Sequence, residues 1–121
     1  MWSEALAVLA RADRADPTVF WPSSGGWEPP IDIWETETGL LVVVALPGVP
    51  RENIEFTIAN GELRVSGIRR WPMLKRPALV HRIEVPNGRF ERRVPLPLGT
   101  FQLVGTNHAD GCLSLNLQRL A

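Results

Sequence analysis

Short segments of strand length, separated by turn-forming dipeptides, occupy this chain from residue 31 onward. Residues 31–36 and 54–58 alternate apolar and polar side chains, which is the pattern of a strand with one buried face. Asn60-Gly61 and Asp110-Gly111 each separate two such segments, and both dipeptides favour the tight turn of a hairpin. About eight strands with no helix between them predict an all-β fold, an immunoglobulin-like antiparallel β-sandwich.

The other strands are predicted from apolar runs and from proline. The continuous apolar run 40–46 has strand length and is expected to be buried on both faces. A short strand is expected at 79–85, inside a long basic loop that spans 68–88. Pro95 removes a backbone donor from the arginine-rich strand that follows Asn87-Gly88, so we expect that strand at a sheet edge.

Residues 1–28 are predicted to be an N-terminal arm in front of a single domain, 29–121. Within the arm, residues 3–15 have the spacing of a short amphipathic helix, and Asp16-Pro17 ends it. Residues 17–30 combine proline and glycine with aromatic side chains, so they are interpreted as an apolar linker.

Charge and composition exclude several classes of function. The formal net charge is zero, so no overall field attracts nucleic acid or a membrane surface, and no apolar run reaches the roughly 18 residues of a spanning helix. A single cysteine and the absence of a basic, apolar leader favour a cytoplasmic protein. The charge is nevertheless divided, with four Lys/Arg against ten Asp/Glu in residues 1–68 and eight against two in 69–93. These blocks either pair, within one chain or between copies, or leave a solvated basic loop.

Six motifs occur in an order that resembles one known family, the small heat-shock proteins with an α-crystallin domain. They are Pro30–Thr36, Leu46-Pro47-Gly48-Val49, Glu62–Gly67, His81–Glu84, Gly88–Arg93 with Leu96-Pro97, and Asp110–Leu113. The resemblance covers about three quarters of the chain and is to the bacterial and plant branch. It implies the same β-sandwich and an ATP-independent holdase, which binds unfolding proteins and suppresses their aggregation. Family members usually carry a C-terminal Ile-x-Ile/Val motif, and residues 118–121 do not contain one, so assembly of large cages through that motif is not expected.

The resemblance also implies a homodimer, formed when a strand of the long loop pairs with the first strand of a second copy. The exchanged strand would be Leu79–Ile83, crossing the acidic region of Asp32, Glu35 and Glu37. Arg92 matches the family's strand arginine and would pair with a carboxylate at that interface. The residues assigned to the dimer interface are Ile31, Asp32, Ile33, Trp34, Leu79, His81, Ile83 and Arg92.

A holdase needs apolar surface that unfolded proteins can reach, and two regions are predicted to supply it. The arm contributes Trp2, Leu6, Leu9, Phe20, Trp21 and Trp27. The edge between 54–58 and 102–108, where the family usually docks its tail, contributes Phe56, Ile58, Leu103 and Val104. The alternative for both groups is ordinary packing against the core.

Other functions are less well supported by the sequence. The two histidines, His81 and His108, do not lie in a metal-ligand spacing with each other or with Cys112, and no catalytic motif is present, so no metal, cofactor or enzyme activity is predicted. Residues 69–76 join basic side chains to a tryptophan, but the neutral chain argues against nucleic-acid binding. The main rival is a peptide-binding scaffold or co-chaperone sandwich that acts by β-strand addition.

Overall fold

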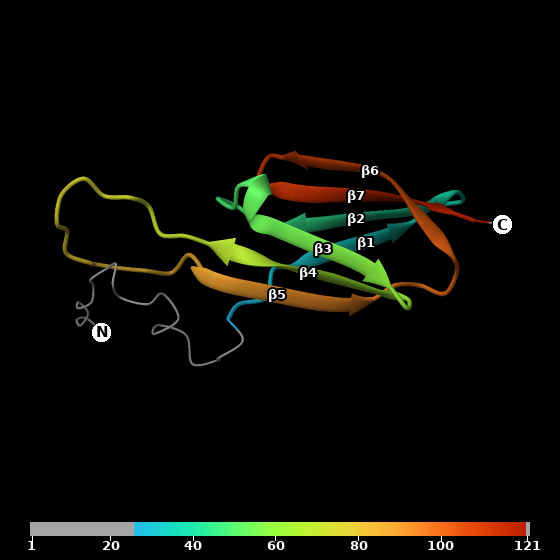
Figure 1. Ribbon diagram of the computed structural model, residues 1–121, viewed down its shortest axis with the longest axis horizontal. Coiled ribbons are helices and arrows are strands. Elements are labelled where there is room, and N and C mark those ends of the chain that lie inside the picture. The colour runs from blue at the N-terminus through green and yellow to red at the C-terminus, as the bar shows by residue number, and fades with distance from the viewer. Residues whose placement is uncertain (1–25, 121) are drawn as a thin grey trace.

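The computed structural model describes residues 26–120, which form two β-sheets packed face to face (Figure 1). The strands are β1 (Ile31–Glu35), β2 (Gly39–Ala45), β3 (Ile54–Ala59), β4 (Glu62–Arg69), β5 (Gly88–Pro95), β6 (Phe101–Ala109) and β7 (Cys112–Arg119), and a 3-10 turn, η3 (Arg51–Asn53), precedes β3. One sheet has the order β1-β2-β7-β6 and the other the order β3-β4-β5, with antiparallel pairing throughout. The predicted all-β sandwich is therefore confirmed.

The core lies where the inward faces of the two sheets meet. Its buried side chains come from alternate positions along the strands, as strand geometry requires. They include Leu40, Val42 and Val44 of β2, Leu113, Leu115 and Leu117 of β7, Leu63 and Val65 of β4, and Phe90 of β5. Burial of each such side chain contributes about 1.5–3 kcal/mol. The expectation that 40–46 is buried on both faces was wrong, because Leu41 and Val43 point to the outer face and are only half-buried.

Two hairpin turns form where the sequence predicts them. Asn60 and Gly61 join β3 to β4 with φ angles of 55° and 73°, and Asp110 and Gly111 join β6 to β7 with φ angles of 55° and 74°. Asparagine and aspartate tolerate this left-handed region better than most residues, and glycine enters it without steric cost. The turns set the register of both hairpins, from Ala59 opposite Glu62 in the first.

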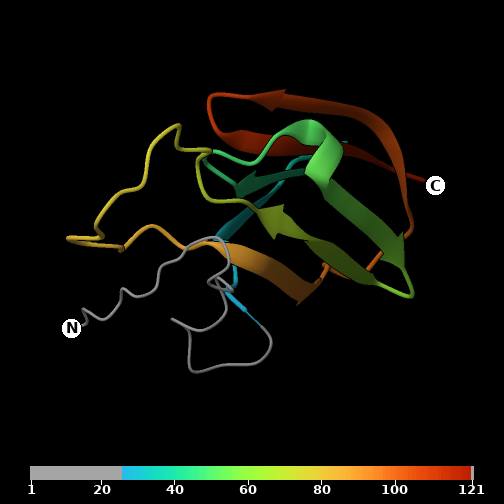
Figure 2. The same cartoon turned by 60° about the vertical axis from the view of Figure 1, so that its left-hand side comes forward.

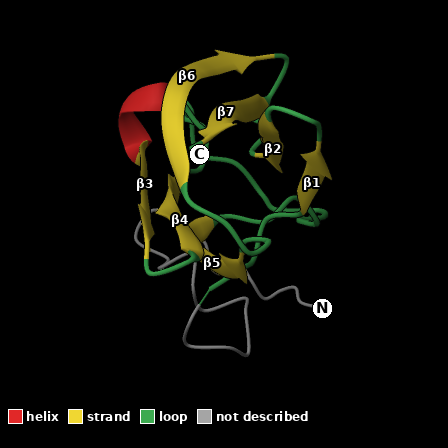
Figure 3. Cartoon of the chain, turned by 90° about the vertical axis from the view of Figure 1, so that its right-hand side faces the viewer, coloured by secondary structure: helices red, strands yellow, loops and turns green. Residues whose placement is uncertain are grey.

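Each sheet has two terminal strands, and these decide where another chain could pair. Viewed along the strands, β3 and β6 lie on one side of the sandwich and β1 and β5 on the other (Figure 3). The arginine-rich strand β5 is terminal in its sheet and ends at Pro95, which confirms the expected edge position.

The long loop between β4 and β5 covers residues 70–87 and extends away from both sheets (Figure 2). Residues 79–85 form no strand in the single chain, and the strand expected there, which would pair with a second copy, stays a prediction. A strand needs a neighbouring strand for its backbone hydrogen bonds, and no strand of residues 26–120 pairs with this segment in the single chain.

Candidate functional site

Five of the predicted client-binding residues lie outside the described part of the chain, as does the predicted helix 3–15. These residues are Trp2, Leu6, Leu9, Phe20 and Trp21. The sixth arm residue, Trp27, is described and lies half-buried against the core rather than free in solvent. The sandwich therefore includes at least one aromatic side chain of the segment 1–28.

The four remaining client-binding candidates lie on the side of the sandwich where β3 and β6 run, and we call them the β3/β6 edge surface. Its members are Phe56 and Ile58 of β3 and Leu103 and Val104 of β6. Phe56 and Ile58 pack against the core but remain half-exposed. Leu103 and Val104 are more open, with 39% and 56% of their surface exposed. Neither strand has a partner on its outer edge among the described strands, so apolar side chains and free backbone groups occur together here.

A β-bulge explains why two successive apolar residues of β6 face solvent. Leu103 is opposite Leu117 and Gly105 is opposite Asn116, so Val104 is an extra residue with no partner across the ladder. A bulge bends the strand and interrupts the alternation of inward and outward side chains. Gly105 is the one sequence signal for it, because glycine within a strand often marks a bulge.

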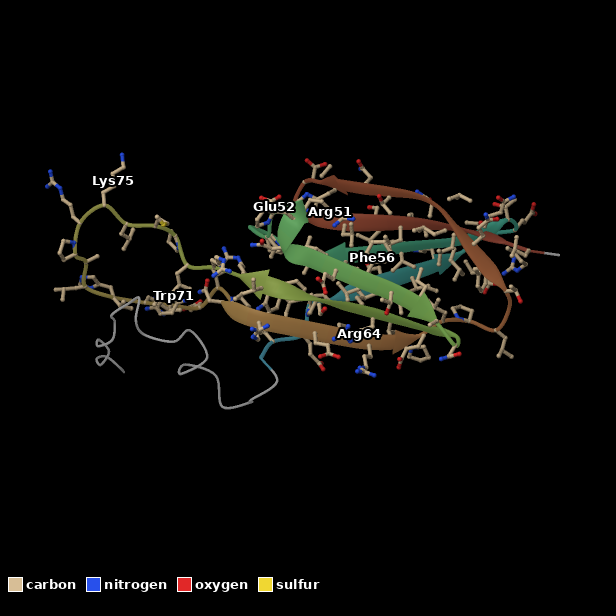
Figure 4. The ribbon with its side chains drawn as sticks, viewed as in Figure 1. Arg51, Glu52, Phe56, Arg64, Trp71 and Lys75 are labelled. Carbon is tan, nitrogen blue, oxygen red and sulfur yellow. The ribbon has the colours of Figure 1, made fainter. Side chains whose placement is uncertain are left out.

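Arg51 was not predicted from the sequence to take part in this surface. Its guanidinium carbon lies 6.0 Å from the centre of the Phe56 ring, and its Nη1 donates a hydrogen bond to the Ile54 carbonyl at 3.1 Å. Figure 4 shows Arg51 on η3 at the start of β3, with Phe56 further along the strand. The cation therefore flanks one end of the apolar surface, where it stacks on the aromatic ring and remains hydrated.

The predicted dimer-interface residues occur in two separate parts of the single chain. On β1, Ile31 and Ile33 pack against the core, whereas Asp32 and Trp34 point outward and Trp34 is 51% exposed. On the long loop, the exposed residues are Leu79 and His81, and Ile83 is half-buried. The predicted contact joins two copies, so its pairing stays a prediction.

One acidic residue expected to meet the basic loop of a second copy is paired within its own chain. The Glu35 carboxylate accepts a hydrogen bond from Arg119 Nη2, and Arg119 Nη1 also donates to the Glu37 carbonyl at 3.3 Å. The same guanidinium lies over the Phe101 ring, 5.4 Å from its centre. Asp32 and Glu37 form no salt bridge with another residue of 26–120.

The arginines of β5 have different environments. Arg92 points toward the sandwich edge, and its Nη1 donates to the Pro29 carbonyl at 2.9 Å. On the outer face, Glu91 accepts hydrogen bonds from Arg93 Nε at 2.9 Å and from Arg64 Nε at 3.0 Å. These two guanidinium groups hold the pKa of Glu91 below its ordinary value, because they stabilise the ionised carboxylate. The pairs are partly exposed and therefore organise the outer face more than they stabilise it.

Arg69 joins the two ends of the long loop to the body of the sandwich, a role that the sequence does not reveal. Its Nε donates to the Pro47 carbonyl at 2.8 Å, and its Nη1 donates to the Pro86 carbonyl at 3.3 Å and to Asn87 Oδ1 at 2.9 Å. Asn87 is the buried polar residue of the described chain, and its Nδ2 donates to the Val85 carbonyl at 2.9 Å. We call Arg69 and Asn87 the loop clamp, because together they fix the direction in which the loop leaves.

The described residues do not assemble a catalytic or metal site. His108 is opposite Leu113 in the last hairpin and Cys112 is opposite Ala109, so the histidine and the cysteine point to opposite faces of the sheet. Within residues 26–120 no three potential metal ligands gather. The helical turn in that part of the chain, η3, is three residues long and cannot span a membrane.

Residues 32–121 match the Hsp20/alpha crystallin family. This stretch includes β1 from its second residue and all of the later strands. The chain belongs to this family. It is 31% identical over 93 residues to the 22.0 kDa heat shock protein of Arabidopsis thaliana and 32% identical over 92 residues to small heat shock protein C4 of Rickettsia felis. These stretches cover 75% of this chain and 48% and 56% of the two relatives, so the chain spans about half the length of the curated proteins it matches.

Solved small heat-shock proteins share the same arrangement of strands. The structure of the small heat-shock protein from Xylella fastidiosa superposes with a TM-score of 0.67 and 27% identity, over 79% of this chain and 89% of that one. The resemblance inferred from the ordered motifs is therefore confirmed, and so is the small heat-shock class of the protein. The β3/β6 edge surface, the loop clamp and the open edge of β1 are its candidate functional features.

Proposed function

We propose that this small heat-shock protein is an ATP-independent holdase that binds partly unfolded proteins and prevents them from aggregating. The observation that carries the proposal is the β3/β6 edge surface, where apolar side chains are exposed beside unpaired strand edges. An unfolding protein exposes extended apolar segments, which can pair with a free strand edge and place alternate side chains against such a surface. Membership of a heat-shock family supports this function.

We also propose that the protein acts as a homodimer in which residues 79–83 of one copy pair with β1 of the other. The open outer edge of β1 supports this arrangement, because its backbone groups have no partner strand among the described residues. The loop supports it too, since Leu79 exposes 82% of its surface in the single chain. Pairing would remove that apolar side chain from water and satisfy both backbones.

The holdase proposal is tested by light scattering from a heat-stressed client enzyme, with increasing amounts of the protein and no ATP. We expect suppression near a stoichiometric ratio. Val104→Asp should weaken suppression, because it introduces a charge into the β3/β6 edge surface. Leu98→Asp is the matched control, since Leu98 is 98% exposed and lies outside that surface.

Three outcomes discriminate between the alternatives. Equal suppression by both variants would move client binding away from the β3/β6 edge surface, toward the arm residues 1–28. No suppression by the folded wild-type dimer would refute the holdase proposal and favour a peptide-binding scaffold that acts by strand addition. The mass of the particle in solution, measured by ultracentrifugation, tests the dimer separately. A monomeric mass would refute the strand exchange.

A further inference from the structure

The outer edge of β5 is covered by the chain's own residues 26–30, which we call the strap. The Trp27 backbone N–H donates to the Arg89 carbonyl at 3.2 Å, and the Glu91 N–H donates to the Trp27 carbonyl at 3.2 Å. These two bonds make a parallel bridge between Trp27 and Phe90. In Figure 1 the described chain begins beside β5 and then runs to β1, on the side of the sandwich opposite the β3/β6 edge surface. The strap thus occupies a strand-addition position.

The side chain of Trp27 fills a defined seat on this edge. Its ring centre lies 5.1 Å from that of Phe90, with the planes tilted by 51°, and its Nε1 donates to the Gly88 carbonyl at 3.3 Å. Phe90 is a core residue with 2% of its surface exposed. Arg92 fixes the next part of the strap through its hydrogen bond to the Pro29 carbonyl. The seat therefore recognises an aromatic side chain, its ring N–H and an extended backbone.

The residue before the aromatic must be glycine. Gly26 has a φ angle of +82°, and a Cβ atom at this position would lie 2.0 Å from the Arg89 carbonyl oxygen. Backbone atoms supply that obstacle, so a side chain cannot be accommodated by a rotamer change. The seat is thus selective for a glycine followed by an aromatic residue.

The strap closes an edge that would otherwise accept a strand. Along the outer edge of β5, the backbone N–H and C=O groups of every second residue point away from β4. Two of these groups, the Arg89 carbonyl and the Glu91 N–H, form hydrogen bonds with the Trp27 backbone. Pro95, at the end of the same strand, has no N–H to offer. A tethered segment competes at an effective concentration in the millimolar range, so a free peptide at micromolar concentration cannot displace it.

We propose that the outer edge of β5 is a second peptide-binding site, occupied by the strap in the resting chain. When the strap leaves, the edge takes an extended polypeptide segment that contains a glycine followed by an aromatic residue. This proposal goes beyond the holdase function proposed above, because it uses the opposite side of the sandwich and does not require the β3/β6 edge surface.

The test compares Gly26→Ala with Gly105→Ala in the full chain. Both substitutions add one methyl group, but at Gly105 the new Cβ meets no atom within 4 Å. Hydrogen exchange of the Glu91 amide reports on the strap directly, since Trp27 is its acceptor. Binding is then measured by fluorescence anisotropy with a labelled peptide that copies residues 25–30, and with the same peptide carrying alanine in place of tryptophan.

We expect Gly26→Ala to accelerate hydrogen exchange of the Glu91 amide. We also expect this variant to bind the tryptophan peptide at least about tenfold more tightly than wild type or Gly105→Ala. The alanine peptide should not bind.

Unchanged Glu91 exchange in Gly26→Ala would show that the strap is not held by this contact and would overturn the proposal. Faster exchange without peptide binding would show that the exposed edge is not a binding site. Equal binding to all three proteins would show that the strap does not mask it. None of these results depends on the light-scattering assay, so the two proposals fail independently.

Discussion

Arg69→Ala should destabilise the protein and loosen the long loop, because it removes the loop clamp. The side chain makes three hydrogen bonds, at 2.8, 2.9 and 3.3 Å, to groups in two different segments. A hydrogen bond made by a charged group contributes about 1.5–3 kcal/mol when buried, and a neutral or exposed one contributes about 1 kcal/mol or less. The Pro47 contact is exposed and the other two are partly buried, so the loss is about 2–3 kcal/mol.

Urea denaturation at a fixed subunit concentration measures this loss. With a slope of about 1–3 kcal/mol per molar urea for a domain of this size, a loss of about 2–3 kcal/mol should lower the midpoint by about 0.7–3 M. Trypsin should also cleave after Lys75 faster in Arg69→Ala than in wild type, since the loop is no longer fixed at its base.

Two variants make the measurement specific to the clamp. Arg70→Ala removes the same type of side chain from the adjacent exposed position and should change the free energy of unfolding by less than about 0.5 kcal/mol. Arg69→Lys keeps the positive charge but cannot donate from a planar fork to separated acceptors, so it should behave like the alanine variant. Equal midpoints for Arg69→Ala and Arg70→Ala would refute the reasoning, and full rescue by lysine would show that charge alone is required.

Three further predictions concern other parts of the sandwich. Gly67→Ala should destabilise by more than about 1 kcal/mol in urea denaturation, because its Cβ would lie 2.1 Å from a carbonyl oxygen of η3, whereas Gly105→Ala should be nearly neutral. Glu91 has a depressed pKa in the folded chain, so its contribution to stability is present at neutral pH and is lost as the pH falls through that pKa. Melting temperatures of wild type and Glu91→Gln should therefore converge on acidification, and a constant gap would contradict this. Arg92→Ala should raise the dimer dissociation constant in ultracentrifugation about tenfold or more, and an unchanged constant would remove Arg92 from the interface.

Predictions from local sequence were confirmed where the determining interactions are local. The turns at Asn60-Gly61 and Asp110-Gly111 depend on the φ angles that these residues tolerate, so the dipeptides alone predict two of the hairpins. The edge position of β5 depends on the missing N–H of Pro95, which is a property of one residue. Residues 79–85 form no strand in the single chain, because a strand requires a partner that its own sequence does not supply, and the expected pairing with a second copy stays a prediction.

The sequence by itself determined the strands, their turns and the membership of the Hsp20/alpha crystallin family, because alternation, turn dipeptides and ordered motifs are all properties of neighbouring residues. Only the tertiary structure decided what the arginines and the aromatic residues contact. Trp27 reaches Gly88 across 61 positions and Arg69 reaches Pro47 across 22, and no local pattern specifies such partners. The same holds for the bulge at Val104, since the pairing of β6 with β7 sets which residue is left without a partner. Those contacts depend on how two sheets pack, and packing brings together residues that are distant along the chain.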